Sequence, residues 1–204
     1  MARRLDGLSA IGFAVAYVVA LMLTNAPDEG ETVREAMDFY NDAGQKLKLL
    51  IAVYCMAAAA LLFVVLVAVT ARRLRDVPRQ VAVIAGTAFV ALYLAAAAAF
   101  VAPTLTLSLD STGANAVNRQ FVNFTRGMST LGDALLLVCA PFAAAAFVAA
   151  LAWAGGLPRW LAWSGYGVAA TCLLGFAFFP LLLFALWIAA RGVWTLSNAS
   201  NSRA

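Results

Sequence analysis

Histidine is absent from the sequence, and cysteine is scarce, with three residues and no Cys-X-X-Cys pair. Without histidine there is no imidazole ligand for a metal and no imidazole general base. Three separated cysteines give no support to a disulfide framework. Cys55, Cys139 and Cys172 each lie within an apolar run, where a thiol packs as a small apolar side chain. We therefore expect no metal and no cofactor.

Charge is also scarce, since 12% of the residues are charged and 64% are hydrophobic. The mean hydropathy is +0.88. Soluble domains usually carry about a quarter charged residues and less than half apolar ones. A chain of 204 residues cannot bury such an excess in one core, so we expect its apolar surface to face a lipid bilayer. The net charge of +4 does not indicate nucleic acid, because the basic residues cluster beside apolar runs, as the positive-inside rule describes.

Long apolar runs such as IAVYCMAAAALLFVVLVAVTA predict membrane-spanning helices. A helix needs about 20 residues to cross the hydrocarbon, and the alternating pattern of barrel strands is missing. The sequence predicts an all-α integral membrane protein, a single domain built as a six-transmembrane-helix bundle. The predicted spans are residues 7–24, 49–70, 81–102, 131–153, 157–177 and 179–197.

The last two predicted spans come from one apolar run of about forty residues, which is too long for a single crossing. It divides at GFAFFP, because Gly175 can end a helix and Pro180 suits the first turn of the next. Six spans place nine Lys and Arg residues on the side of both termini and five on the other; one long crossing would leave seven against seven. The positive-inside rule favours two crossings, with both termini in the cytoplasm.

Prolines and polar stretches predict the connections. The polar stretch 25–48 predicts a short amphipathic helix in the first outer loop, because Thr32 and Glu35 have capping-box spacing. We expect the third span to end at Pro103 and residues 103–130 to form a polar loop with a short surface helix. Pro141 predicts a kink in the fourth span.

Several stretches resemble a known family. LPRWLAWSGYGVAA followed by FPLLLFALWIAARGVW, and MDFYNDAGQKLKLL followed by ARRLR, are similar to six-span actinobacterial membrane proteins akin to the domain-of-unknown-function group numbered 4386. The resemblance implies a six-helix bundle in a bacterial plasma membrane. It implies no reaction and no functional residues.

Ionisable residues within predicted spans are candidate sites, because burying a charge in lipid is costly. Asp133 and Arg191 qualify as a candidate intramembrane polar site. The favoured interpretation is that Asp133 caps the fourth span and that Arg191 extends to the inner headgroups. We expect no ion pair between them, since they lie near opposite membrane faces. Anionic phospholipid headgroups are predicted to contact four arginines, Arg72, Arg73, Arg75 and Arg79.

Three classes of function remain open. An accessory or scaffold protein that binds lipid, a membrane protein partner or a second copy of itself fits the sequence best. The alternative is a small transporter or channel with a cavity between the helices, for which Pro141 is the main sign of a broken helix. An enzyme is the weakest interpretation, because no nucleophile–base pair or midplane carboxylate is evident.

Overall fold

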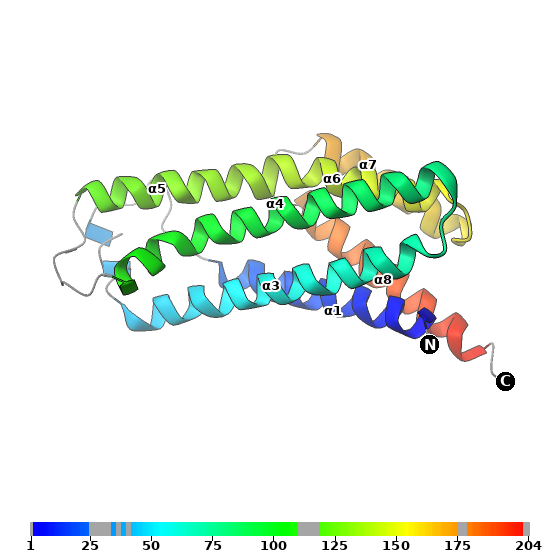
Figure 1. Ribbon diagram of the computed structural model, residues 1–204, viewed down its shortest axis with the longest axis horizontal. Helices are drawn as coiled ribbons and strands as arrows, with labels where there is room; N and C mark the ends of the chain where they lie inside the picture. Colours follow the sequence, from blue (N-terminus) through cyan, green and yellow to red (C-terminus); the bar gives the residue numbers. More distant parts are fainter. Residues whose placement is uncertain are drawn as a thin grey trace.

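The computed structural model describes residues 2–24, 34–35, 38–39, 42–109, 119–174 and 179–201, and these residues contain helices and no strands. Figure 1 shows them packed as one elongated bundle. The helices are α1 (Ala2–Leu23), α3 (Ala43–Ala71), α4 (Asp76–Leu109), α5 (Arg119–Asp133), the π-helix η1 (Ala134–Cys139), α6 (Ala140–Trp153), α7 (Arg159–Leu174) and α8 (Phe179–Asn201).

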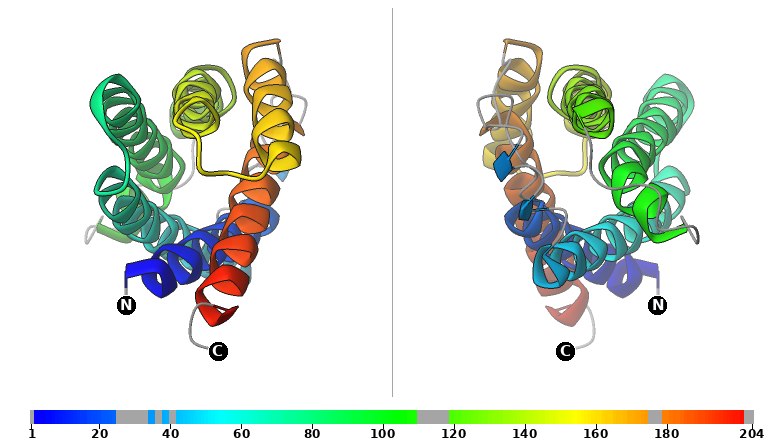
Figure 2. Two further views of the ribbon diagram at one scale, coloured as in Figure 1. Left: turned by 90° about the vertical axis from the view of Figure 1, so that its right-hand side faces the viewer. Right: turned by 90° about the vertical axis from the view of Figure 1, so that its left-hand side faces the viewer.

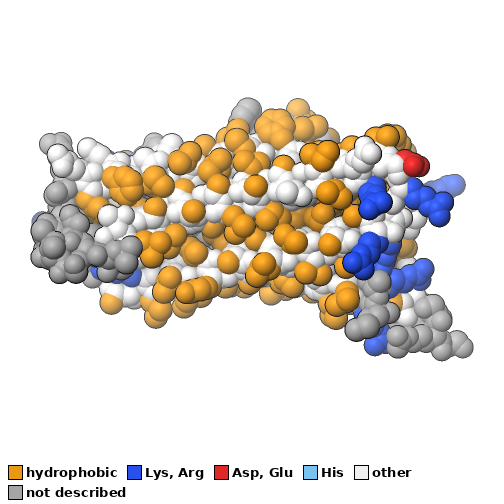
Figure 3. All heavy atoms as spheres, viewed as in Figure 1, with side chains coloured by type: hydrophobic (Ala, Val, Ile, Leu, Met, Phe, Trp, Pro, Cys, Tyr) orange, Lys and Arg blue, Asp and Glu red, His pale blue; other side chains and the backbone are white. Residues whose placement is uncertain are grey.

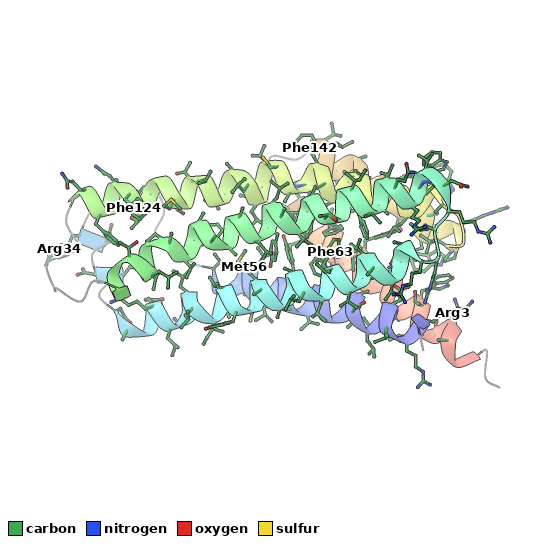
Figure 4. All side chains as sticks on the ribbon, in the orientation of Figure 1. Arg3, Arg34, Met56, Phe63, Phe124 and Phe142 are labelled. Carbon is green, nitrogen blue, oxygen red and sulfur yellow. The ribbon has the colours of Figure 1, made fainter. Side chains whose placement is uncertain are left out.

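Viewed from its end, the bundle is a ring of helices (Figure 2), which the contacts between neighbouring helices close. The packing order is α1, α3, α4, α6, α7 and α8, and α8 packs back against α1. Aromatic side chains fill the centre of the ring. Phe13, Phe63, Phe89, Phe147 and Phe184 have no solvent exposure, and the Phe13 and Phe63 ring centroids lie 4.8 Å apart. In Figure 4 the Phe63 side chain points from α3 into the bundle.

The face of the bundle seen in Figure 3 is apolar over most of its described length. Leu61, Ile84 and Leu174, for example, are 68%, 70% and 81% exposed. A soluble monomer rarely exposes apolar area on this scale, whereas lipid favours it. Five helical stretches are long and apolar enough to cross a membrane: Arg3–Leu23, Ala43–Ala71, Asp76–Thr106, Gln120–Trp153 and Phe179–Ala199. The structure therefore fits a multi-pass, all-helical membrane protein.

The predicted fifth span is the one that these five stretches leave out. It corresponds to α7, which has 16 residues and is about 24 Å long, less than the roughly 30 Å of the hydrocarbon. The count of six spans is thus not confirmed. The chain does reverse between α7 and α8, because Trp187 Nε1 donates to the Leu161 carbonyl at 3.0 Å and Cys172 Sγ lies 3.6 Å from the Pro180 carbonyl. Residues 175–178, where the turn was predicted, lie outside the described residues.

The prediction that the third span ends at Pro103 is wrong. Helix α4 continues through Pro103 to Leu109 and is about 51 Å long. Most of the predicted 103–130 loop within the described residues is also helical, because α5 runs without a break into η1 and α6. Helix α4 and the continuous helix formed by α5, η1 and α6 reach farther along the bundle than α7 does (Figure 1). Both are therefore longer than the roughly 30 Å thickness of the hydrocarbon.

The helix break near Pro141 takes the form of the π-helix η1. The Ala140 N–H donates to the Leu135 carbonyl, five residues earlier. Pro141 has no N–H, so it cannot donate to the Leu137 carbonyl as an α-helix would require. A one-turn π-helix accommodates this missing donor without ending the helix.

The amphipathic helix predicted in the first outer loop is not confirmed. Arg34, Glu35, Asp38 and Phe39 are helical, and residues 25–33, 36–37 and 40–41 lie outside the described residues. Asp42 follows it and caps α3, since its side chain accepts from the backbone N–H groups of Gly44 at 2.6 Å and Gln45 at 3.1 Å. This cap explains why α3 begins at Ala43, earlier than the predicted start of the second span.

A charged cavity at the basic end of the bundle

One end of the bundle, here called the basic end, carries most of the Lys and Arg side chains seen in Figure 3. It consists of the start of α1, residues 72–75 between α3 and α4, residues 154–158 between α6 and α7, and the end of α8. The described arginines that the positive-inside rule assigns to the cytoplasm therefore lie together at one end of the bundle.

Asp6 is the centre of a buried hydrogen-bond cluster at this end. It lies in the second turn of α1 and is 1% exposed. Its Oδ2 is 2.8 Å from Arg73 Nη1 and 3.2 Å from Arg191 Nη2. Thr70 Oγ1 donates to its Oδ1 at 3.2 Å. Three helices that are distant in sequence are thus joined through one carboxylate.

Arg191 of α8 does not extend to the headgroups as expected, because only 6% of the residue is exposed. Its Nη2 donates to Asp6 and, at 3.0 Å, to Thr70 Oγ1. Its Nη1 is buried and has no hydrogen-bond partner within the described part of the chain. A planar guanidinium carries five donors, so this side chain keeps unused donor capacity next to the cluster.

Close packing of α1 against α8 brings Asp6 and Arg191 within reach. Each is followed by a glycine, and these glycines, Gly7 and Gly192, lie at the helix contact. A Cβ atom added to Gly192 would lie 2.9 Å from both the Ala10 Cβ and the Gly7 carbonyl oxygen. Only glycine permits this approach, as in other close helix pairs in membranes.

A cavity of about 500 Å³ opens beside the cluster. Its lining comes from α1, α3, α4, α6 and α8 and from both connections at the basic end, so it occupies one mouth of the helix ring. The charged lining residues are three arginines and two aspartates, which leaves one positive charge in excess: Arg73, Arg75, Arg191, Asp6 and Asp76. The volume lies within the range of small-molecule sites.

The four arginines predicted to contact lipid fall into two groups. All four residues are exposed, but Arg73 and Arg75 also line the cavity. Arg79 instead borders a shallow surface hollow with Asp76 and Gln80. Arg72 lines neither hollow. The structure therefore joins two of the predicted lipid-contacting residues to Arg191, a connection that the sequence did not predict.

Asp133, the other candidate residue, lies apart from this cluster. It is exposed and has helical backbone angles at the junction of α5 with η1, where its side chain makes no capping hydrogen bond. The predicted capping role is wrong, because the helix already began at Arg119. Arg191 pairs with Asp6 instead, in keeping with the expectation that Asp133 and Arg191 do not meet.

Sequence reasoning overlooked Asp6. The predicted first span begins at residue 7, so Asp6 fell outside it, whereas α1 already begins at Ala2. The sequence could have indicated this pairing, because the six-span arrangement places the start of the first span, with Asp6, and the end of the last span, with Arg191, at the same membrane face. An acid at one and a base at the other can neutralise each other there.

A second polar feature lies deeper in the ring. The rings of Tyr17 from α1 and Tyr93 from α4 are 5.4 Å apart, and neither side chain is exposed. Both hydroxyl groups are buried without a partner among the described residues.

Among the described residues no group of three or more His, Cys, Asp or Glu side chains could hold a metal ion. No protein-family model matches the sequence, and searches of curated proteins and of solved structures found no significant match. The geometry of the basic end is therefore the main observation on which a function can be proposed.

Proposed function

We propose that this chain is an accessory protein of a bacterial plasma membrane that binds anionic phospholipid at its basic end. The observation that supports this most is the position of the exposed arginines 72, 73, 75 and 79, which lie together at the end of the apolar bundle where a charged cavity opens. Two of them, Arg73 and Arg75, line that cavity. In a bilayer this end meets the headgroups, where each basic residue contributes about 1 kcal/mol of attraction to anionic lipid. Both termini are then cytoplasmic.

The six-span architecture is part of the same proposal. Helix α7 would be the fifth crossing, and the arrangement would be that of the actinobacterial six-span family. Exposed aromatic side chains at both ends of this hairpin support a crossing, because Trp160 and Trp163 are 60% and 74% exposed and Phe179 is 73% exposed. Aromatic residues of this kind are enriched at both membrane interfaces.

A small transporter or channel is the second candidate, and the cavity at the mouth of the ring favours it. A transport pathway would have to continue along the ring axis. Phe13, Phe63, Phe89 and Phe184 fill that axis and are fully buried. These side chains would have to separate during each cycle, so binding without transport is the simpler proposal. Binding of a partner protein or of a second copy is an outcome that the lipid experiment can reveal.

Retention of lipid by the purified protein tests the proposal. Native mass spectrometry would compare phosphatidylglycerol with phosphatidylcholine, each added to the protein in detergent. We expect severalfold greater retention of phosphatidylglycerol, and a smaller preference after Arg72→Gln and Arg79→Gln are combined. The matched control is Lys46→Gln with Lys48→Gln at the other end of the bundle. Equal retention of the two lipids by the unmodified protein would refute the proposal.

A further inference from the structure

We infer that the cavity at the basic end is a built site for one phosphate group, with Arg191 at its base and Arg73 and Arg75 at its entrance. The inference rests on the proposed function only for the source of the phosphate, a phospholipid headgroup. The site itself follows from the side chains that line the cavity. It differs from a general attraction at the membrane surface, because it requires particular residues and a buried donor.

The buried donor is Arg191 Nη1. Arg191 lines the cavity and is 6% exposed, and this nitrogen has no partner among the described residues. A buried donor without an acceptor is costly, and more so on a charged group. The Nη2 of the same side chain is occupied by Asp6 and Thr70. An acceptor oxygen supplied through the cavity would therefore complete the coordination of Arg191.

The charge of the lining selects an anion. Asp6 is already compensated by Arg73 and Arg191, at 2.8 and 3.2 Å. Arg75 and Asp76 are the remaining charged lining residues, so the whole set carries one excess positive charge. A phosphodiester has a single negative charge and would make the filled cavity neutral. A cation would meet the excess positive charge of the lining and the unused Arg191 donor.

The geometry of the side chains also suits phosphate. Guanidinium groups bind phosphate oxygens through paired N–H donors, and three of them meet at this cavity. Arg73 is partly exposed, with 34% of its side chain accessible, while it keeps one contact with Asp6. It can therefore contact both the carboxylate and a group that enters the cavity. This arrangement would place a headgroup phosphate at the mouth of the ring, with its acyl chains directed to the bilayer.

Isothermal titration of the full chain in detergent, with short-chain phosphatidylglycerol below its micelle concentration, tests the site. The chief comparison is Arg75→Gln, which lines the cavity, against Arg72→Gln, which lies in the same connection but does not. Both side chains are exposed, so neither change should impair folding. We expect Arg75→Gln to weaken binding severalfold and Arg72→Gln to change it less than about twofold, because only the first removes a charge-assisted contact.

Arg191→Met examines the base of the cavity. It should weaken binding by about tenfold or more, with partial recovery in Arg191→Lys, which keeps the charge but lacks the planar donor pair. Arg3→Met is the matched control, since Arg3 is an exposed basic residue of the same end that does not line the cavity. Equal binding by all these variants would overturn the inference. If Arg191→Met does not fold, the Arg75 and Arg72 pair still decides the question.

Inorganic phosphate distinguishes the source of the ligand. Binding of the short-chain lipid with dependence on Arg75, and much weaker binding of inorganic phosphate, supports a headgroup site. Binding of inorganic phosphate with the same dependence supports the phosphate site and overturns the lipid source. Preference for anionic lipid in mass spectrometry without dependence on Arg75 or Arg191 would support the proposed function and refute this site.

Discussion

Replacing Asp6 by asparagine should destabilise the bundle far more than removal of an exposed charge. Asp6 is 1% exposed and is the countercharge for Arg191, which is 6% exposed. Asparagine keeps the size of the side chain and can still bond to Thr70, but it removes the negative charge. Arg191 would then be a buried cation with no charged partner among the described residues.

The expected loss is about 3 kcal/mol of unfolding free energy, at the lower end of the roughly 3–5 kcal/mol typical of breaking a buried ion pair, because the asparagine side chain would still accept hydrogen bonds. Arg73→Gln should cost less than about 1 kcal/mol, because the Arg73 side chain is 34% exposed and Asp6 keeps its buried partner Arg191. Unfolding by sodium dodecyl sulfate in mixed micelles, followed by the fluorescence of the five tryptophans, measures both changes.

A double-mutant cycle then isolates the pair. Asp6→Asn combined with Arg191→Met should be less destabilising than the sum of the two single changes, by about 1–3 kcal/mol, because each single change leaves a buried group without its partner. Additive effects, or a cost below about 1 kcal/mol for Asp6→Asn, would show that this cluster is solvated in the membrane and would refute the reasoning.

Three further changes test other parts of the structure. Tyr17→Phe and Tyr93→Phe should leave the unfolding free energy unchanged or raise it by about 1 kcal/mol, because each removes a buried hydroxyl without a partner among the described residues; a clear loss would reveal an acceptor. Gly192→Val should cost about 1–3 kcal/mol in the same unfolding assay, because its side chain would collide with α1; full stability would contradict the tight α1–α8 contact. In a cysteine-free background, Ser197→Cys should react with an impermeant thiol reagent only from the cytoplasmic face and Lys48→Cys only from outside; the reverse pattern would overturn the proposed orientation.

Some of the architecture could be read from short stretches of sequence. The helices and the reversal near Pro180 follow from local properties, since hydropathy and a missing backbone N–H act within one or two turns. The extent of α4 could not be read in this way. Its sequence turns polar near Pro103, but α4 packs against α5, Pro103 and Thr104 are buried, and the helix continues to Leu109. Tertiary packing here outweighs the local preference for a helix end.

Composition and the length of the apolar runs were sufficient to predict helices that fit a membrane, with most of the arginines on one side, because these properties belong to local stretches of the chain. The contacts of those arginines, in contrast, depend on the packing of helices that are distant in sequence. Arg191 and Asp6 are 185 residues apart, and their contact depends on two glycines that let α1 and α8 approach. The cost of burying a charge depends on the groups that surround it in space, and in this ring those groups come from separate helices.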